Sequence, residues 1–191
     1  MSSGGAEQAR SRICLYDAAQ LEAVLEEIAQ RTAGLLTGTD EIVLAGIRRR
    51  GAPLARELGR RLAHGFGIRV SEHVELDIKR YADDLSLLYP ETRLTEDPAH
   101  QELDLSSRSV VVVDDVIYGG HSLLHAVQYL AHKKAEEIRT VVLVDRGAAK
   151  LPVRIDVAGV RLDVASSDII ECWIPPFESG WGIHLVQRLR R

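Results

Sequence analysis

The chain has 191 residues, of which 46% are hydrophobic and 27% are charged. This length and balance favour one globular domain with a single core rather than two domains. The formal net charge of −4 argues against nucleic-acid binding through overall charge, so any such contact needs a local basic patch. No apolar run approaches the roughly 20 residues that a membrane-spanning helix requires, so we expect no membrane association.

The first residues and the cysteines indicate the cellular compartment. Residues 1–14 are predicted to form a disordered or arm-like tail ahead of a single domain at 15–191. The opening stretch is polar and has no hydrophobic segment of the kind found in secretory signals. Cys14 and Cys172 are far apart and have no metal-ligand spacing, so we expect reduced thiols in a cytoplasmic protein.

Apolar periodicity predicts helices and strands that alternate along the chain. The first helix has a capping box formed by Asp17 and Gln20, and the second opens with Pro53, which a first helical turn tolerates. The helices are predicted at 17–31, from Pro53 onwards and from Ser122 onwards; the strands are predicted at 41–47, 68–76, 110–113, 140–145 and 168–174, with short antiparallel pieces at 151–164. This order predicts an α/β fold with a mainly parallel central sheet flanked by helices and with ligands at the carboxyl ends of its strands.

The most informative stretch is VVVVDDVIYGGHSLLHAVQYL at 110–130. Asp114 and Asp115 follow a buried strand, and the loop before the next helix consists of Gly119, Gly120, His121 and Ser122. Backbone N–H groups of a glycine loop at a helix N-terminus bind anions, commonly phosphate. Carboxylates at a strand end accept hydrogen bonds from sugar hydroxyls, so the stretch predicts a site for a phosphorylated sugar. Such turns also occur in α/β proteins without a ligand, and a purely structural turn is the alternative.

A second strand-to-helix turn contains Arg48, Arg49, Arg50 and Gly51. Guanidinium groups and loop amides are suited to bind a pyrophosphate. Because this turn also follows a predicted parallel strand, it belongs at the same edge of the sheet as the glycine loop. A solvated basic turn is the alternative interpretation.

Residues 77–107 are predicted to be the most mobile internal segment, because they are polar, contain prolines and have no clear period. Long segments of this kind in compact domains act as lids or binding loops. They also form plain surface in many proteins.

Four segments, in order, resemble the PyrR branch of the type I phosphoribosyltransferases, which are pyrimidine-operon attenuators and uracil phosphoribosyltransferases. The segments are GIRRRGAPLARELGRRL, ELDIKRYADDLS, VVVVDDVIYGGHSLLHAVQYL and VVLVDRGAAKLPVRIDVAGV. The resemblance covers about residues 15–165 and fades after Ser167, where WIPPFESGWG departs from the family. It implies the type I phosphoribosyltransferase fold with a small hood. It also implies transfer of a phosphoribosyl group from phosphoribosyl pyrophosphate (PRPP) to uracil, giving UMP and pyrophosphate.

The resemblance further implies roles for individual residues. The implied catalytic residues are Asp114, Asp115 and Arg50. The implied PRPP-binding residues are Arg49, Arg50, Gly51, Asp114, Asp115, Gly119, Gly120, His121 and Ser122. The implied lid residues are Lys79, Arg80, Tyr81, Asp83 and Asp84, and the implied uracil-binding residues are Arg146, Pro152, Val153 and Arg154, with the hood at 152–159. Gly119 and His121 depart from the family's Thr-Gly-Arg/Lys-Thr-like loop, and Arg49 replaces a small residue. Mg²⁺ would arrive with PRPP rather than in a protein cage.

Two function hypotheses stay open from the sequence. The first is the uracil phosphoribosyltransferase. The second is a non-catalytic or weakly catalytic sensor of PRPP or nucleotide that binds pyr mRNA or a protein partner. Arg60, Arg61 and the C-terminal arginines favour RNA, although basic helical faces are usually only solvated. The family precedent implies a homo-oligomer, a dimer or a tetramer, in which the aromatic residues at 173–181 would cover a sheet edge or form a subunit contact.

Overall fold

The computed structural model describes residues 10–79, 93–165 and 167–188. The helices are α1 (Ala18–Leu35), α2 (Gly51–Phe66), α3 (His121–His132) and the 3₁₀ helix η1 (Pro98–His100). The strands are β1 (Arg10–Tyr16), β2 (Glu41–Ile47), β3 (Arg69–Lys79), β4 (Arg93–Thr95), β5 (Ser109–Ile117), β6 (Glu137–Asp145), β7 (Val157–Arg161), β8 (Ile169–Trp173) and β9 (Gly182–Arg188). Within the described ranges, no helix is both long and apolar enough to cross a bilayer.

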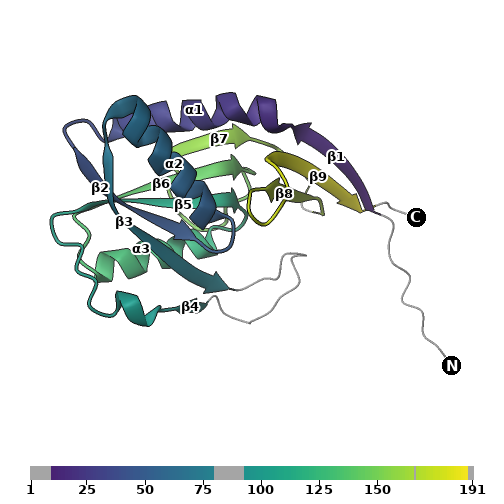
Figure 1. Cartoon of the computed structure of the whole chain (residues 1–191). Helices are drawn as coiled ribbons and strands as arrows, with labels where there is room; N and C mark the ends of the chain where they lie inside the picture. Colours follow the sequence, from purple (N-terminus) through teal and green to yellow (C-terminus); the bar gives the residue numbers. More distant parts are fainter. Residues whose placement is uncertain (1–9, 80–92, 166, 189–191) are drawn as a thin grey trace.

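The central sheet has six strands in the order β4-β3-β2-β5-β6-β7. All neighbours are parallel except β3 and β4, and α1 and α2 cover one face while α3 covers the other (Figure 1). Val111 and Val113 of β5 pack in the core under α1 and α2, whereas Val110 and Val112 pack in the core under α3. A strand covered on both faces needs a continuous apolar run, and the predicted mainly parallel α/β sheet is confirmed.

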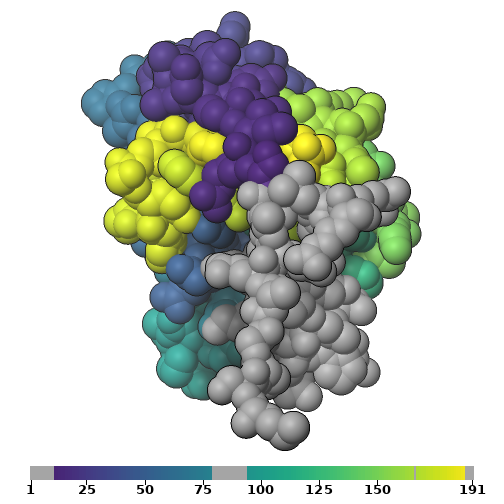
Figure 2. Space-filling model, turned by 90° about the vertical axis from the view of Figure 1, so that its right-hand side faces the viewer, coloured from purple at the N-terminus to yellow at the C-terminus, as the bar shows by residue number. Residues whose placement is uncertain are grey.

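A smaller sheet, which we call the hood, has the order β1-β9-β8 and is entirely antiparallel. It joins the two ends of the described chain, and Figure 2 shows the purple N-terminal residues against the yellow C-terminal ones. The prediction of a hood at 152–159 is wrong, because β7 is the edge strand of the central sheet and is parallel to β6. The predicted end of the tail after residue 14 falls inside β1, and residues 1–9 lie outside the described part.

Most predicted elements are present, with shifted ends. The capping box of α1 is confirmed, since the backbone N–H of Gln20 donates to Asp17 Oδ1 at 2.9 Å and the N–H of Asp17 donates to Gln20 Oε1 at 3.0 Å. Helix α2 begins at Gly51 rather than at Pro53. Strand β5 includes Asp114 and Asp115 rather than ending before them. Its pairing with β6 continues past the acids, so the sheet ladder overrides the local preference for a turn.

The segment that follows β3 is better ordered than predicted where it is described. Strand β4 pairs with the end of β3, so 77–79 and 93–95 belong to the sheet. Lys133 of α3 donates to the carbonyl oxygens of His100 and Gln101 at 2.8 and 3.0 Å, and the hydroxyl of Tyr129 donates to Glu96 at 3.0 Å. These bonds fasten the segment to α3. The predicted lid residues Arg80, Tyr81, Asp83 and Asp84 lie outside the described residues, and Lys79 is the last residue of β3.

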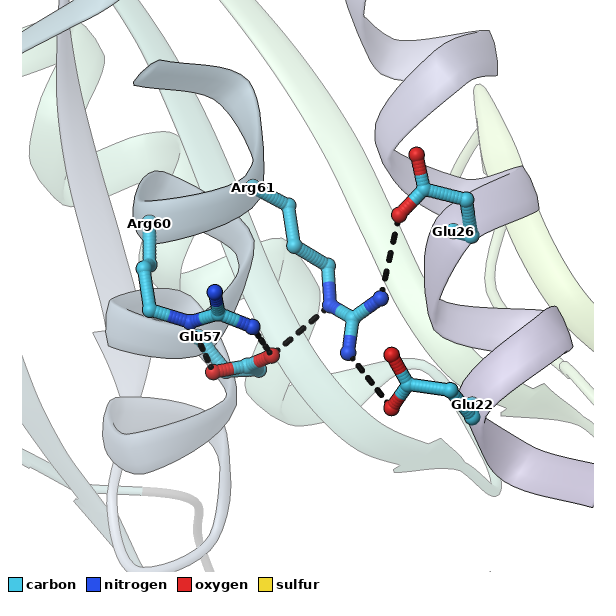
Figure 3. Close-up of polar contacts among 5 residues, drawn as sticks. All are labelled: Glu22, Glu26, Glu57, Arg60 and Arg61. Atoms are coloured by element: carbon cyan, nitrogen blue, oxygen red, sulfur yellow. Dashed lines mark hydrogen bonds and ion pairs between the residues drawn. The ribbon is translucent and has the colours of Figure 1, made fainter. Parts of the chain in front are cut away.

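Arg61 of α2 links this helix to α1, its neighbour on the same face of the sheet. Its side chain is only 6% exposed and contacts Glu22 at 2.8 Å, Glu26 at 3.1 Å and Glu57 at 2.7 Å (Figure 3). Arg60 pairs with the same Glu57 at 2.6 Å. The cluster therefore contains more carboxylates than guanidinium groups. Arg60 and Arg61, which favoured an RNA partner in the sequence, are therefore neutralised by glutamates, and RNA binding stays a prediction.

Replacement of Arg61 tests the strength of this junction. We expect Arg61→Ala to lower the free energy of unfolding by about 1.5–3 kcal/mol, because hydrogen bonds to charged groups and the packing of a buried stem are lost together. The matched variant Arg60→Ala removes an exposed ion pair and should cost less than about 1 kcal/mol. Urea denaturation of both variants measures the difference. Equal losses would contradict a special role for Arg61.

Candidate functional site

A cavity of about 690 Å³ opens at the carboxyl ends of β2, β5 and β6, between the central sheet and the hood. Its charged and polar lining residues include Arg48, Arg50, Asp114, Asp115, Tyr118, His121, Ser122, Arg146, Lys150 and Glu171. Gly119 and Gly120 line the same space. The prediction that the two acids face one shared cavity beside the glycine loop is therefore confirmed.

The acid pair lies near the end of β5 in surroundings that disfavour its charge. Burial, together with the charge of Asp115, raises the pKa of Asp114 well above its ordinary value. Burial also raises the pKa of Asp115, although the nearby Arg50 guanidinium opposes the shift. Asp114 Oδ1 accepts the backbone N–H of Asp115 at 2.9 Å. Sugar hydroxyls or a cation brought by a ligand would stabilise the charged carboxylates and reduce the repulsion between them.

The residues fit a magnesium ion that arrives with its ligand. Two adjacent carboxylates supply hard oxygen donors, and Mg²⁺ in proteins commonly binds one or two carboxylates and takes its other oxygens from phosphates and water. Among the described residues, no group of three or more His, Cys, Asp or Glu side chains is arranged to hold a metal ion. Asp114 and Asp115 are thus the residues that would contact such an ion.

The glycine loop is shaped and supported by its surroundings. Gly120 precedes α3 in the left-handed conformation, with φ of 86°, and a Cβ there would lie 2.8 Å from Val153 Cγ2. The carbonyl oxygen of Gly119 accepts the N–H groups of Lys150 and Leu151 at 3.2 and 3.3 Å. Helix α3 begins at His121, one residue from the predicted start, and the first amides of a helix have no helical acceptor. The loop therefore has the form of an anion-binding turn, and it lies at the edge of the cavity.

The arginine turn is packed closely against β5. A Cβ on Gly51 would lie 2.5 Å from the carbonyl oxygen of Val113, so only glycine allows α2 to start this close to the acid pair. Gly51 and Arg49 do not line the cavity, in contrast to Arg48 and Arg50.

All three arginines of this turn have partners. Arg48 Nε pairs with Glu75 at 2.9 Å, and Arg50 Nη2 pairs with Glu178 at 2.5 Å. The Arg49 guanidinium carbon lies 5.1 Å from the centre of the Phe177 ring. The turn is therefore held by side chains of this chain, and a ligand would have to compete for its guanidinium groups.

The residues implied to bind uracil are dispersed. Arg146 lines the cavity, but its guanidinium donates to the carbonyl oxygens of Ala165 and Asp168 at 3.1 and 3.0 Å and lies 4.5 Å from the Tyr118 ring centre. Val153 supports Gly120 from behind. Pro152 and Arg154 are exposed, Arg154 pairs with Asp156 at 2.9 Å, and none of residues 152–154 lines the cavity.

Sequence reasoning missed several lining residues. Lys150 lies on the loop after β6, whose backbone bonds to Gly119 bring it to the cavity. Ile170 and Cys172 reach the cavity from β8 of the hood, and the Tyr118 hydroxyl donates to the Ile170 carbonyl oxygen at 2.8 Å. A lone lysine in a loop has no spacing signal. An apolar strand by itself also gives no indication of the surface against which it packs.

Comparison with known proteins assigns this arrangement to a family. The family model described as "Phosphoribosyl transferase domain" matches residues 14–178. The "Bifunctional protein PyrR" of Pelotomaculum thermopropionicum is 38% identical over 165 residues, which cover 84% of this chain and 87% of that protein. The protein of the same name from a Roseiflexus species is 34% identical over 169 residues, with 87% and 90% coverage.

The fold has close counterparts among solved structures. The hypoxanthine phosphoribosyltransferase from Trypanosoma cruzi, in complex with the product IMP, matches with a TM-score of 0.70 and 16% identity. The match covers 98% of this chain and 94% of that chain. This likeness confirms the predicted type I fold with its hood and, at such low identity, shows the fold alone.

The raised pKa of Asp114 leads to a pH-dependent prediction. Protonated Asp114 contributes to the stability of the folded protein. This contribution is fully present below about pH 3.9, the pKa of the carboxyl group in the unfolded chain. It is lost as the pH rises through the higher pKa of the same group in the folded protein. We therefore expect Asp114→Asn to increase the melting temperature at pH 7 by roughly 2–4 °C for each kcal/mol of repulsion removed. The increase should vanish near pH 3.5.

The control for this prediction is Asp104→Asn, measured by the same thermal denaturation. The hydrogen bonds from Ser106 lower the pKa of the exposed Asp104, so that variant should show no gain at pH 7. An Asp114→Asn protein that is less stable than the wild type at pH 7 would contradict the conclusion that the charge of Asp114 destabilises the folded protein.

Proposed function

Since this chain belongs to the PyrR family of phosphoribosyltransferases, we propose that it transfers the phosphoribosyl group of PRPP to uracil, with release of pyrophosphate. The observation that carries the proposal is the shared cavity. The acid pair of β5, the glycine loop before α3 and Arg50 before α2 all line one space of about 690 Å³. Phosphate, sugar and pyrophosphate of one PRPP molecule account for all three groups.

Each part of the cavity takes one part of the ligand in this proposal. The amides at residues 119–122 and the Ser122 hydroxyl bind the 5′-phosphate. Asp114 and Asp115 accept the ribose hydroxyls and contact Mg²⁺, which supplies charge neutralisation for the pyrophosphate when bound. Arg50 binds the pyrophosphate. Lys150 supplies a cationic side chain beside a loop in which His121 replaces the usual Arg or Lys.

The chemistry requires positioning more than covalent catalysis. The bond from ribose C1 to the pyrophosphate oxygen breaks while the bond from C1 to a uracil ring nitrogen forms, and positive charge develops on the ribose. The ring nitrogen gives up its proton to solvent, and the bond electrons leave with the pyrophosphate. Burial makes the negative charge of Asp114 and Asp115 unfavourable. The same charge stabilises a positively charged transition state, so the acid pair acts electrostatically at the moment of transfer.

Uracil is proposed to bind at the hood end of the cavity. Ile170 and Cys172 line this end from β8, the edge strand of the hood. The backbone groups of an edge strand are available to pair with other donors and acceptors, and the edge of uracil alternates acceptor, donor and acceptor. Arg146 and Tyr118 connect this end to the central sheet and keep the hood in place.

A second candidate function uses the same cavity for sensing. The contact of Arg50 with Glu178 favours a regulator that binds PRPP or nucleotide with little turnover, because a pyrophosphate ligand meets an occupied guanidinium. The neutralised face of α2 gives an RNA partner no support. Binding to pyr mRNA and a homo-oligomeric state, dimer or tetramer, stay predictions.

Turnover separates these two functions. We expect UMP to form from uracil, PRPP and Mg²⁺ with the wild type, and Asp115→Asn to reduce kcat/KM at least about 100-fold, as removal of a strong electrostatic stabiliser does. Two binding measurements complete the test. Calorimetry measures the binding of PRPP, and a salt series measures the binding of RNA. Tight PRPP binding without turnover would favour the sensor, and no PRPP binding by a folded protein would refute both.

The altered glycine loop generates a further prediction. Gly119 has no left-handed backbone angle, so its backbone allows a side chain. A Cβ at this position would lie 3.1 Å from His121 Cδ2. Replacement of His121 removes this close contact. Gly119→Thr with His121→Arg should therefore strengthen PRPP binding, by at most about 2–4 kcal/mol from one or two charge-assisted hydrogen bonds.

Lys150 serves as the internal check of this prediction. If Lys150 already supplies the positive charge, Lys150→Gln should weaken PRPP binding, and the double replacement should gain more in the Lys150→Gln background than in the wild type. The exposed Lys134, which pairs with Asp104, provides the control variant Lys134→Gln with no change. Equal gains in both backgrounds would mean that Lys150 does not contact the phosphate region.

A further inference from the structure

The turn at 174–181, which connects β8 to β9, holds a carboxylate on the arginine turn. Glu178 Oε1 accepts hydrogen bonds from Arg50 Nη2 at 2.5 Å and Nε at 3.2 Å. The other oxygen, Oε2, accepts the backbone N–H of Ile174 at 2.8 Å. The side chains of Arg50 and Glu178 are 21% and 18% exposed. Both oxygens are thus engaged in a largely enclosed contact.

Glu178 is held by its own turn as well as by Arg50. The N–H groups of Phe177 and Glu178 donate to the carbonyl oxygen of Ile174 at 3.1 and 3.4 Å, which closes the turn around the Glu178 carboxylate. Phe177, which is 46% exposed, lies against Arg49. Two adjacent residues of this turn therefore contact two adjacent residues of the arginine turn.

The contact involves a cavity-lining guanidinium rather than a remote surface pair. Arg50 lines the cavity, and its charge acts on Asp115. The side of a guanidinium group that contains Nε and Nη2 is a preferred site for carboxylate and for phosphate oxygens alike. In this structure that side is taken by Glu178.

We infer that Glu178 is an internal competitor for the pyrophosphate group and that it sets the affinity of the cavity for pyrophosphate-bearing ligands. A ligand that takes the Nε and Nη2 side of Arg50 must displace the carboxylate, and its apparent affinity falls by the cost of that displacement. Displacement also releases the 174–181 turn from Arg50. This inference rests on the proposed function for the identity of the ligand.

The test compares two ligand fragments on the full-length protein. Glu178→Gln keeps the shape of the side chain and an oxygen for the Ile174 N–H but removes the charge. We expect the dissociation constant for inorganic pyrophosphate with Mg²⁺, measured by calorimetry, to fall about 10-fold, since a neutral amide competes less for a guanidinium group. Ribose 5-phosphate, which has no pyrophosphate, should bind equally to both proteins.

Two further variants separate competition from other effects. Glu171→Gln removes another cavity-lining carboxylate of the hood, one that pairs with Arg12 at 3.0 Å, and should change pyrophosphate affinity less than 2-fold. Glu178→Asp keeps the charge but shortens the side chain, so it should give an intermediate gain. It also provides a second measurement where Glu178→Gln does not fold.

The outcomes distinguish this inference from the proposed function. A wild type that binds both fragments, with no gain or a loss in Glu178→Gln, would overturn the inference alone and make Glu178 a positioning residue for Arg50. A similar gain in Glu171→Gln would also overturn it, because it would show a general effect of charge. A folded wild type that binds neither fragment would overturn the proposed function and this inference together.

Discussion

Both faces of β5 are covered, so a polar side chain has room only at the carboxyl end of the strand. The helices on either side bury Val110 to Val113 completely, and the acids that follow are forced into the space between the sheet and the hood. Every other part of the site is arranged around that end. Gly51 brings α2 against β5 beside Asp114, and the glycine loop leads from β5 into α3.

The electrostatics of the site follow from this placement. Burial raises the pKa of both Asp114 and Asp115, and the charge of Asp115 raises that of Asp114 further, whereas Arg50 of the arginine turn lowers that of Asp115. This compensation is incomplete, because Glu75 and Glu178 already engage Arg48 and Arg50. The site thus combines two unfavourable features. The two acids repel each other, and glutamates of the chain compete with a ligand for the arginines. A ligand with hydroxyls and phosphates that binds together with a divalent cation can relieve both, and PRPP with Mg²⁺, the ligand of the proposed function, has this chemistry.

Several features of this site were predictable because they depend on local order in the chain. A continuous valine run indicates a strand buried on both faces, and glycines before a helical period indicate an anion-binding turn. The start of α3 was predicted within one residue for that reason. The ends of β3 and β5 were predicted less well, since pairing with β4 and β6 extends both strands beyond their local signals. The neutralisation of Arg61 was not predictable from its own helix alone, because two of its three glutamate partners, Glu22 and Glu26, lie on α1.

The sequence by itself determined the class of fold, the acid pair with its glycine loop, and the family. Periodicity, residue order and motif spacing are properties of short stretches, and short stretches suffice for these. Only the tertiary structure decided that the hood is built from β1, β8 and β9, that Lys150 lies at the cavity, and that Glu178 occupies Arg50. These contacts join residues as much as 178 positions apart, as in the pairing of Arg10 with Arg188, and their geometry arises from how the sheets pack together, for which no local pattern exists.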